Sequence, residues 1–303
     1  MSWVADELTN ASATWKTFTA IVKVRQGSTG ENMKTAQGVL MLSSGAAVAL
    51  MLAAAMPAAA SPAGRHNANS TGSITSILKT GDIVTGVRGT ADGKVVLTGS
   101  APAGGGTQTG PFLYEGPLTV AAKGAAVSVL TPPFLGVTSA TFYGPDTHKF
   151  NPRAIPAGQV RAVGSYQSSA AAPGVINQGM IYLGPVTGSG GSWQSIDVPA
   201  DGAHTVGHVR ACPKSRPHCF VMDTIAHSTM GDLVVGNYDL KPTVRGGLVS
   251  GNAFIYSITK RQWTLLRLHG SLSTKSTFYG IWQDGGSRSP RYTLVGGSSA
   301  RGG

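Results

Sequence analysis

A set of short apolar segments recurs along this chain with a period of about 68 residues. Residues 141–144 (TFYG) return as residues 277–280, and residues 160–166 (VRAVGSY) resemble residues 233–238 (LVVGNY). Self-similar units of short strands are typical of stacked or radially arranged sheets, because each unit needs a neighbour to bury its apolar face. The repeat therefore constrains the architecture, whereas it specifies no activity.

Each repeat contains four segments rich in Val, Ile, Tyr, Phe and Trp and divided by Gly, Pro, Asn, Asp and Ser, which is typical of strands. The first segments are residues 83–86, 141–144, a weaker 205–207 and 277–280, and the second are 95–100, 160–166, 233–238 and 293–298. The third are residues 112–114, 180–182 and 254–256, and the fourth are 127–130, 193–198 and 263–268. Four strands per unit is the number found in a propeller blade.

The second segments each carry a glycine, and these glycines lie 65, 72 and 60 residues apart: Gly99, Gly164, Gly236 and Gly296. A glycine inside a strand permits the close approach of another backbone. A β-sandwich would give strands at similar intervals but no reason for the same four-strand order to return. We therefore predict an all-β fold, a β-propeller of four-stranded antiparallel blades, with units at about 83–131, 137–199, 204–271 and 277–303.

The last unit of this predicted propeller ends after its second segment. Either residues 73–78 (SITSIL) complete the final blade and close the ring, or the chain is cut short and its last blade is incomplete. The second alternative is favoured slightly, because one N-terminal strand does not replace two missing ones.

The N-terminal part of the chain differs from the repeats in composition. Residues 35–64 carry no charge, residues 39–57 are mostly Ala, Leu, Val and Met, and Lys34 lies just before them. Small residues at 58–60 match what a signal peptidase recognises, so we predict a signal peptide at 33–60, cleaved after Ala60. We then expect residues 1–32 to precede the true translation start. Residues 61–72 are expected to form a flexible linker and residues 73–303 the repeat domain. The mature protein is expected to be secreted or periplasmic. The alternative is a membrane anchor over residues 38–60.

The two cysteines, Cys212 and Cys219, have six residues between them. In an oxidising compartment this pattern predicts a local disulfide that closes a loop. A zinc site is the alternative, because His204, His208 and His218 lie in the same stretch. The surrounding sequence is typical of strand and loop rather than helix, so the histidine spacing has no geometric meaning, and we expect no metal and no cofactor.

The chain has an excess of basic residues, with 24 Lys and Arg against 13 Asp and Glu. Four basic and three acidic groups lie in residues 1–60, so the rest keeps 20 basic and 10 acidic groups. Such a balance favours polyanionic partners. The basic residues are scattered and form no stripe interleaved with aromatics, so we expect a glycan or an anionic envelope polymer rather than nucleic acid. We expect a monomer, with no membrane partner once the signal is removed.

Five ring-bearing residues are candidates for ligand contact: Phe142, Tyr143, Phe278, Tyr279 and His227. Exposed at a ring opening, the aromatic residues would stack on sugars, whereas buried they would pack between blades. His227 is expected in a turn before the second strand of the third unit. A Ser follows it directly, but no nucleophile elbow (G-x-S-x-G) occurs in the chain, so a serine hydrolase is not predicted.

Carboxylates offer the alternative of glycan hydrolysis, which uses a pair of acids. Asp146, Asp232 and Asp284 fall near the ends of predicted inner strands and could face a channel. Most Asp residues of this chain lie in turn-forming sequence, where Asp is common for structural reasons.

The third segments resemble a repeat of extracellular β-propellers, the HAF repeat, named for a His-Ala-Phe triplet. Residues 252–256 (NAFIY) keep two of these three residues, whereas Asn252 replaces His, Met180 stands for Phe in the second unit and Pro111 precedes Phe112 in the first. The resemblance implies export and a propeller, and no particular reaction. The sequence thus favours an exported, non-catalytic propeller that binds a surface ligand, with a secreted glycoside hydrolase as the alternative.

Overall fold

The computed structural model describes residues 16–23, 81–103, 108–117, 127–212, 214, 219–241, 249–266 and 275–299. These belong to one of two units of the chain, and the other unit, residues 26–74, lies outside them. The predicted signal peptide, linker and segment 73–78 therefore fall outside the described residues. No helix in the described part of the chain is long and apolar enough to cross a membrane.

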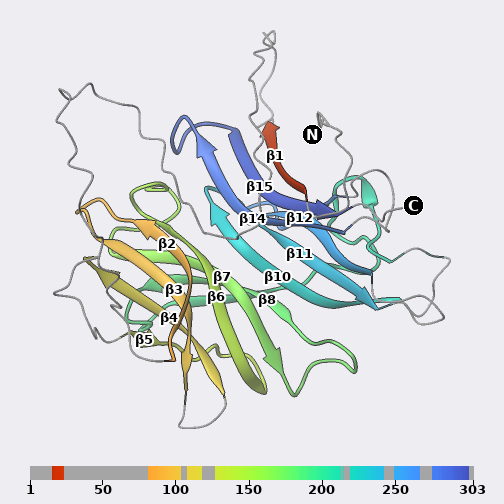
Figure 1. Ribbon diagram of the computed structural model, residues 1–303, viewed down its shortest axis with the longest axis horizontal. Helices are drawn as coiled ribbons and strands as arrows, with labels where there is room; N and C mark the ends of the chain where they lie inside the picture. Colours follow the sequence, from red (N-terminus) through yellow and green to blue (C-terminus); the bar gives the residue numbers. More distant parts are fainter. Residues whose placement is uncertain are drawn as a thin grey trace, which may run out of the picture. The chain divides into compact units, whose positions relative to one another are not determined.

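The described residues form four antiparallel sheets that follow one another along the chain (Figure 1). The first sheet is β2 (Ile83–Gly89), β3 (Val95–Pro102), β4 (Thr109–Gly116) and β5 (Ser128–Val129), and the second is β6 (Val137–Thr147), β7 (Gln159–Ser168), β8 (Gln178–Pro185) and β9 (Ser192–Ile196). The third is β10 (Phe220–Met230), β11 (Leu233–Lys241), β12 (Val249–Ser257) and β13 (Gln262–Leu265). The fourth contains β14 (Lys275–Asp284), β15 (Arg291–Ser299) and β1 (Lys16–Lys23). The all-β prediction is confirmed, and the predicted four-strand unit is found in the first three sheets, whereas the described part of the fourth sheet has three strands.

The four glycines of the second segments occupy one equivalent position in the four sheets. Each pairs with a residue of the preceding strand: Gly99 with Val84, Gly164 with Phe142, Gly236 with Ala226 and Gly296 with Phe278. A Cβ atom on any of the four would lie 1.8–2.0 Å from a backbone carbonyl oxygen of the partner strand. The side chain is excluded by this backbone contact, so the close approach predicted from the sequence is confirmed.

One residue after this pair, the first strand of each sheet carries a β-bulge. The bulged residues, which have no partner in the register, are Thr85, Tyr143, His227 and Tyr279. A bulge disrupts the ladder locally and re-aims the side chain of the extra residue. The four first strands, β2, β6, β10 and β14, therefore share a local geometry that their sequences only partly share.

The expectation that residues 205–207 form the first strand of the third unit is wrong. They lie at a short 3₁₀ turn, η2 (Val206–His208), while β10 takes the place of the first strand. The prediction failed because the bulge segment of β10 reads Ala226-His227-Ser228 and shares no residue type with TFYG. The equivalence of the two segments lies in backbone pairing alone.

Neighbouring sheets pack in chain order through their first strands. β6 lies against β2, β3 and β4, β10 against β6, β7 and β8, and β14 against β10, β11 and β12. A Cβ atom on Gly86 would lie 2.0 Å from the carbonyl oxygen of Tyr143, and one on Gly144 would lie 2.6 Å from that of His227. At the equivalent Gly280, only the Val295 side chain of the described residues comes within 4 Å, at 3.8 Å. The bulges of the second and third sheets therefore seat on the first strand of the sheet before them, and among the described residues no bulge seats in this way beside Gly280.

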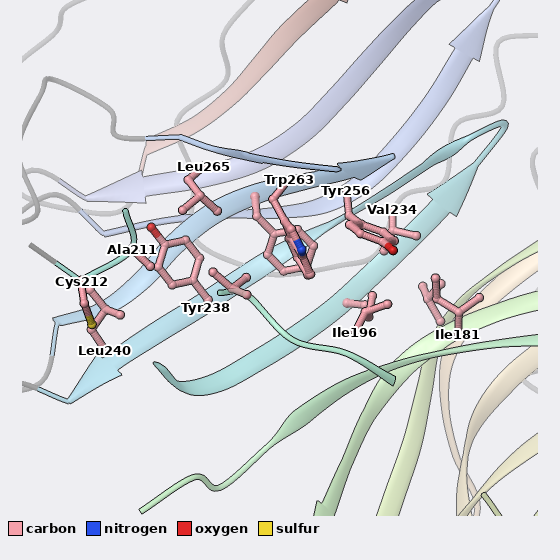
Figure 2. Packing of buried hydrophobic residues seen from close by; sticks show 14 residues of the cluster. Ile181, Ile196, Ala211, Cys212, Val234, Tyr238, Leu240, Tyr256, Trp263 and Leu265 are labelled. Carbon is pink, nitrogen blue, oxygen red and sulfur yellow. The ribbon is translucent and has the colours of Figure 1, made fainter. Parts of the chain in front are cut away.

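The largest apolar cluster fills the space between the second and third sheets (Figure 2). Ile181 and Ile196 of the second sheet face Val234, Tyr256 and Trp263 of the third. All five are at most 5% exposed. Full burial of one such side chain contributes about 1.5–3 kcal/mol to folding, so this interface holds the two sheets together.

The third strand of the fourth sheet comes from the N-terminal part of the chain, which the sequence did not predict. β1 pairs antiparallel with β15, and Phe18 lies opposite Gly296. The corresponding third-strand residues opposite the glycines of the other sheets are Phe112, Met180 and Phe254. β1 is therefore the third strand of the fourth sheet, in the same register as the other third strands.

Candidate functional site

Three of the four bulged side chains come together. The ring centroids of Tyr143 and His227 are 5.2 Å apart, and those of His227 and Tyr279 are 5.1 Å apart, both in edge-on orientation. The fourth bulged residue, Thr85, donates its hydroxyl hydrogen to the carbonyl oxygen of Phe142, the residue before Tyr143. We call Thr85, Tyr143, His227 and Tyr279 the bulge cluster. One residue from each sheet contributes to it.

The bulge cluster is accessible from solvent. Tyr279 is 59% exposed, and the other three side chains are partly buried. Edge-on contacts between rings are favourable because the positive edge of one ring meets the negative face of the next. The cluster thus holds aromatic side chains in a fixed arrangement while one of them stays open.

A hydrogen-bonded amide orients His227 within the cluster. Its Nε2 is 2.7 Å from Asn237 Oδ1, and the hydroxyl of Thr277 donates to the same oxygen at 3.1 Å. Because an amide oxygen only accepts, Nε2 carries the hydrogen and Nδ1 is left as an acceptor. Burial lowers the pKa of His227, partly offset by the hydrogen bond to Asn237. The imidazole is therefore neutral at pH 7.

The structure separates the five predicted contact residues into two groups. Tyr143, His227 and Tyr279 belong to the bulge cluster, whereas Phe142 and Phe278 are fully buried. Phe142 stacks on Trp193 at 5.6 Å between ring centroids. The two phenylalanines thus have the packing role. The expectation that His227 lies in a turn is also wrong, because it lies inside β10.

A second set of equivalent residues lies three positions after each bulge: Arg88, Asp146, Met230 and Trp282. The Arg88 guanidinium is 5.7 Å from the ring centroid of Trp282, which links the first sheet to the fourth. It also lies 5.8 Å from the ring centroid of Phe150 and donates through Nε to the carbonyl oxygen of Pro145. The first strands of the first and fourth sheets therefore come close at this level.

The three candidate acids accept hydrogen bonds from other groups of the protein. Asp146 is fully buried and accepts hydrogen bonds from the backbone N–H of Thr147 at 2.9 Å and of Gly231 at 3.2 Å. Burial raises its pKa, and the nearby charges of Arg88 and Arg161 oppose this rise.

The other two candidate acids hold turns and strand ends in place. Asp232 accepts hydrogen bonds from the hydroxyls of Ser257 and Thr259 and from the backbone N–H of Thr259. Asp284 accepts one from the hydroxyl of Thr293 at 2.8 Å. With Asp146 sealed from solvent, the three carboxylates do not form an open catalytic pair.

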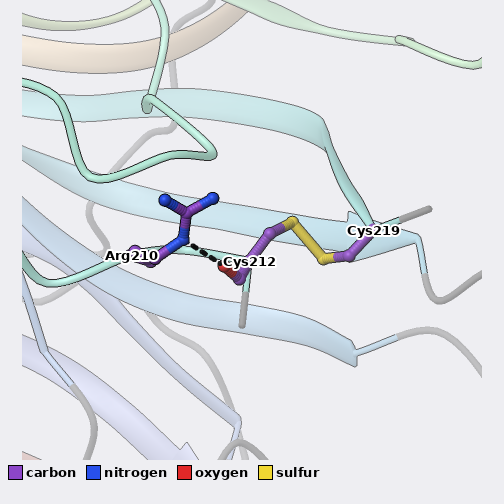
Figure 3. The surroundings of a disulfide bond; sticks show 3 residues. All are labelled: Arg210, Cys212 and Cys219. Carbon is purple, nitrogen blue, oxygen red and sulfur yellow. Dashed lines mark hydrogen bonds between the residues drawn. A yellow bond between two sulfur atoms is a disulfide. The ribbon is translucent and has the colours of Figure 1, made fainter. Parts of the chain in front are cut away.

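The predicted disulfide is present and ties a loop to the edge of the third sheet (Figure 3). Cys212 and Cys219 are joined with Cα atoms 5.6 Å apart, and Arg210 Nε donates to the carbonyl oxygen of Cys212 at 3.2 Å. Both sulfurs are therefore unavailable to a metal. Among the described residues no group of three or more His, Cys, Asp or Glu side chains could hold a metal ion, and His218 lies outside them.

His204 and His208 lie in a loop, where their backbone conformation shapes a turn. Both adopt positive φ angles, 54° and 53°, at the two ends of the turn that contains η2. The backbone N–H of Trp263 donates to the carbonyl oxygen of His204 at 2.8 Å, which attaches the loop to β13.

Sequence reasoning missed Thr85 and Asn237 as members or partners of the cluster. The residue type of Thr85 gives no sign that it is equivalent to Tyr143, His227 and Tyr279. The equivalence is visible only in the strand pairing, where Thr85 follows the residue that pairs with Gly99.

Comparison with models of protein families finds no match, and a search of curated proteins finds none either.

Proposed function

We propose that the four sheets are blades of a β-propeller and that the protein binds a surface glycan through the bulge cluster. The equivalent first strands and the contact of Arg88 with Trp282 support an arrangement of these strands around a common axis. The observation that carries the proposal is that bulged residues from successive sheets meet, with two tyrosines and a neutral histidine in contact.

The chemistry of the cluster suits a sugar. The face of an exposed tyrosine stacks on the apolar face of a pyranose ring, and its hydroxyl donates or accepts a hydrogen bond. His227 Nδ1 adds an acceptor for a sugar hydroxyl. A formal net charge of +11 favours glycans that carry negative charge.

Export belongs to the same proposal. The Cys212–Cys219 disulfide supports it, because disulfides persist in oxidising compartments and are rare in reducing ones. The uncharged stretch before residue 64 supports it from the sequence side.

A glycan array probed with the purified protein, followed by titration of the best ligand, tests the proposed binding. Replacing the exposed tyrosine (Tyr279→Ala) should weaken binding about three- to tenfold, because one aromatic stacking contact contributes about 0.5–1.5 kcal/mol. Tyr279→Phe should retain most of the affinity if stacking dominates. Leu135→Ala is the matched control, since Leu135 is 82% exposed and lies outside the cluster. Equal affinities for Tyr279→Ala and the unaltered protein would contradict the proposal.

A further inference from the structure

A cavity of about 400 Å³ lies between the second and third sheets, away from the bulge cluster. This volume is at the lower end of the range for small-molecule sites, about 300–1,000 Å³. Its lining residues come from β7, β8, β9 and the turn between β12 and β13: Arg161, Ile181, Leu183, Ser192, Trp193, Gln194, Ile258 and Arg261. The lining combines two arginine residues with apolar side chains.

Arg161 is a buried cation with few partners. It is 5% exposed, and its Nη1 donates to the carbonyl oxygen of Gly231 at 2.6 Å. Within the described residues it makes no other hydrogen bond and no ion pair within 4.0 Å. A guanidinium has five donor hydrogens, and burying a charge without a paired partner is costly. The site therefore has unused capacity for an anion.

The neighbouring carboxylates do not supply that anion. Asp146 and Asp232 act on Arg161 electrostatically, but their oxygens are occupied by backbone N–H groups and hydroxyls. Asp146 also faces the positive charge of Arg88. Counting Arg88, Arg161 and Arg261 against Asp146 and Asp232, this region has one more positive than negative charge.

Arg261 adds a second guanidinium at the exposed end of the lining. It has a φ angle of 49°, which is unfavourable for a residue with a Cβ atom. The turn that imposes this angle is held by Asp232, which accepts two hydrogen bonds from Thr259. Arg261 is thus placed on a braced turn at the lining of the cavity.

From this geometry we infer that the cavity is a binding site for a compact organic oxyanion, with its carboxylate or sulfate group between Arg161 and Arg261. Planar guanidinium groups bind such oxyanions through paired N–H donors. The apolar side chains Ile181, Leu183 and Ile258 contact the carbon body of the ligand. A sugar acid has both features.

Calorimetric titration of the full chain with glucuronate, acetate and glucose tests the inference. The titration uses the Tyr279→Ala variant as well as the unaltered protein, so that sugar stacking at the bulge cluster can be separated from the cavity. In that variant glucuronate should bind more tightly than glucose, and acetate should bind more weakly than glucuronate because it lacks a body to contact the apolar wall. Sodium sulfate should raise the unfolding temperature of the unaltered protein more than that of Arg261→Gln. The general stabilising effect of sulfate acts on both proteins, so the difference reports binding to the folded state.

The variant Arg261→Gln should weaken glucuronate binding about tenfold, the usual effect of losing one charge-assisted hydrogen bond. Lys260→Gln is the matched control: it removes the same charge from the same turn but not from the cavity lining. No binding of glucuronate, or equal losses in the two variants, would overturn the inference. Glucuronate binding that is lost in Arg261→Gln but kept in Tyr279→Ala belongs to the cavity, whereas the reverse pattern belongs to the bulge cluster and would overturn the inference.

Discussion

His227 shows how much a single residue depends on its backbone position. Its ring contacts Tyr143 and Tyr279 only because a bulge removes it from the ladder of β10, and Asn237 on the adjacent strand fixes its orientation. The groups that face it are neutral aromatic and amide side chains, which favour the uncharged imidazole. From the sequence, the same residue was expected in a turn.

Acidification should destabilise the protein through His227. Burial lowers its pKa in the folded state below about 6.5, the value of an unfolded chain. The unfolded state then binds more protons, so the stability due to this group is present above pH 6.5 and is lost as the pH falls toward the folded pKa. The unfolding temperature should therefore fall between pH 7 and pH 5 more steeply for the unaltered protein than for His227→Gln.

The comparison of the two proteins isolates His227 from the carboxyl groups. Burial raises the pKa of Asp146, Asp197 and Asp239, so these groups favour folding as the pH falls and act in the opposite direction in both proteins. Parallel curves for the two proteins would show that His227 does not titrate in this range.

At the scale of the element, the bulged first strand is the unit that orders the sheets. A glycine follows the bulge in the first, second and fourth sheets, and Ser228 follows it in the third. In the first two sheets this glycine lets the strand sit directly on the bulge of the next sheet, Gly86 on Tyr143 and Gly144 on His227. The corresponding Gly280 has open space beside it in the described structure. The same sequence position is therefore under different packing constraints in different sheets.

Alanine at Gly144 and at Gly280 should have unequal effects on stability. A Cβ atom at Gly144 would lie 2.6 Å from the carbonyl oxygen of His227, and backbone cannot move aside cheaply, so we expect a loss of about 1–3 kcal/mol. Gly280→Ala meets no close atom and should change stability by less than about 0.5 kcal/mol. Urea unfolding of both variants measures the difference. Equal losses would contradict the sheet order described for β6, β10 and β14.

The sequence predicted elements well where residue types repeat and failed where only geometry repeats. The second strands were found because the four glycines are required by a backbone contact, which no other residue satisfies. The first strand of the third sheet was missed, because the bulged position holds different residue types in different sheets, Thr, Tyr or His. β1 was missed because its equivalence to the other third strands rests on its pairing with β15, which sequence spacing does not reveal.

At the scale of the whole molecule, the fourth sheet joins the two ends of the described chain. β1 and β15 pair over eight residues, from Lys16 opposite Ser298 to Lys23 opposite Arg291. Cleavage after Ala60, as expected for an exported protein, would remove β1 and leave β15 at the edge of its sheet. An open strand edge presents unpaired N–H and C=O groups.

A protein that begins at Ser61 should therefore be less stable than the full chain. Loss of the β1–β15 ladder should lower the unfolding temperature by about 5 °C or more, since each 1 kcal/mol shifts it by roughly 2–4 °C in a chain of this size. Calorimetry of the two proteins gives the comparison. A protein lacking only residues 2–12 keeps β1 and should unfold like the full chain, and identical temperatures for all three would argue against a stabilising role of β1.

The sequence by itself determined the all-β class, the repeated unit, the glycine at each corner and the disulfide, because these depend on local residue chemistry and short spacings. Only the tertiary structure decided which residues are equivalent at the bulges, that Phe142 and Phe278 are buried while Tyr279 is exposed, and that the buried Arg161 lines a cavity. The physical reason is that burial and pairing between sheets depend on contacts between residues that are distant in the sequence, whereas composition and spacing report only on neighbours.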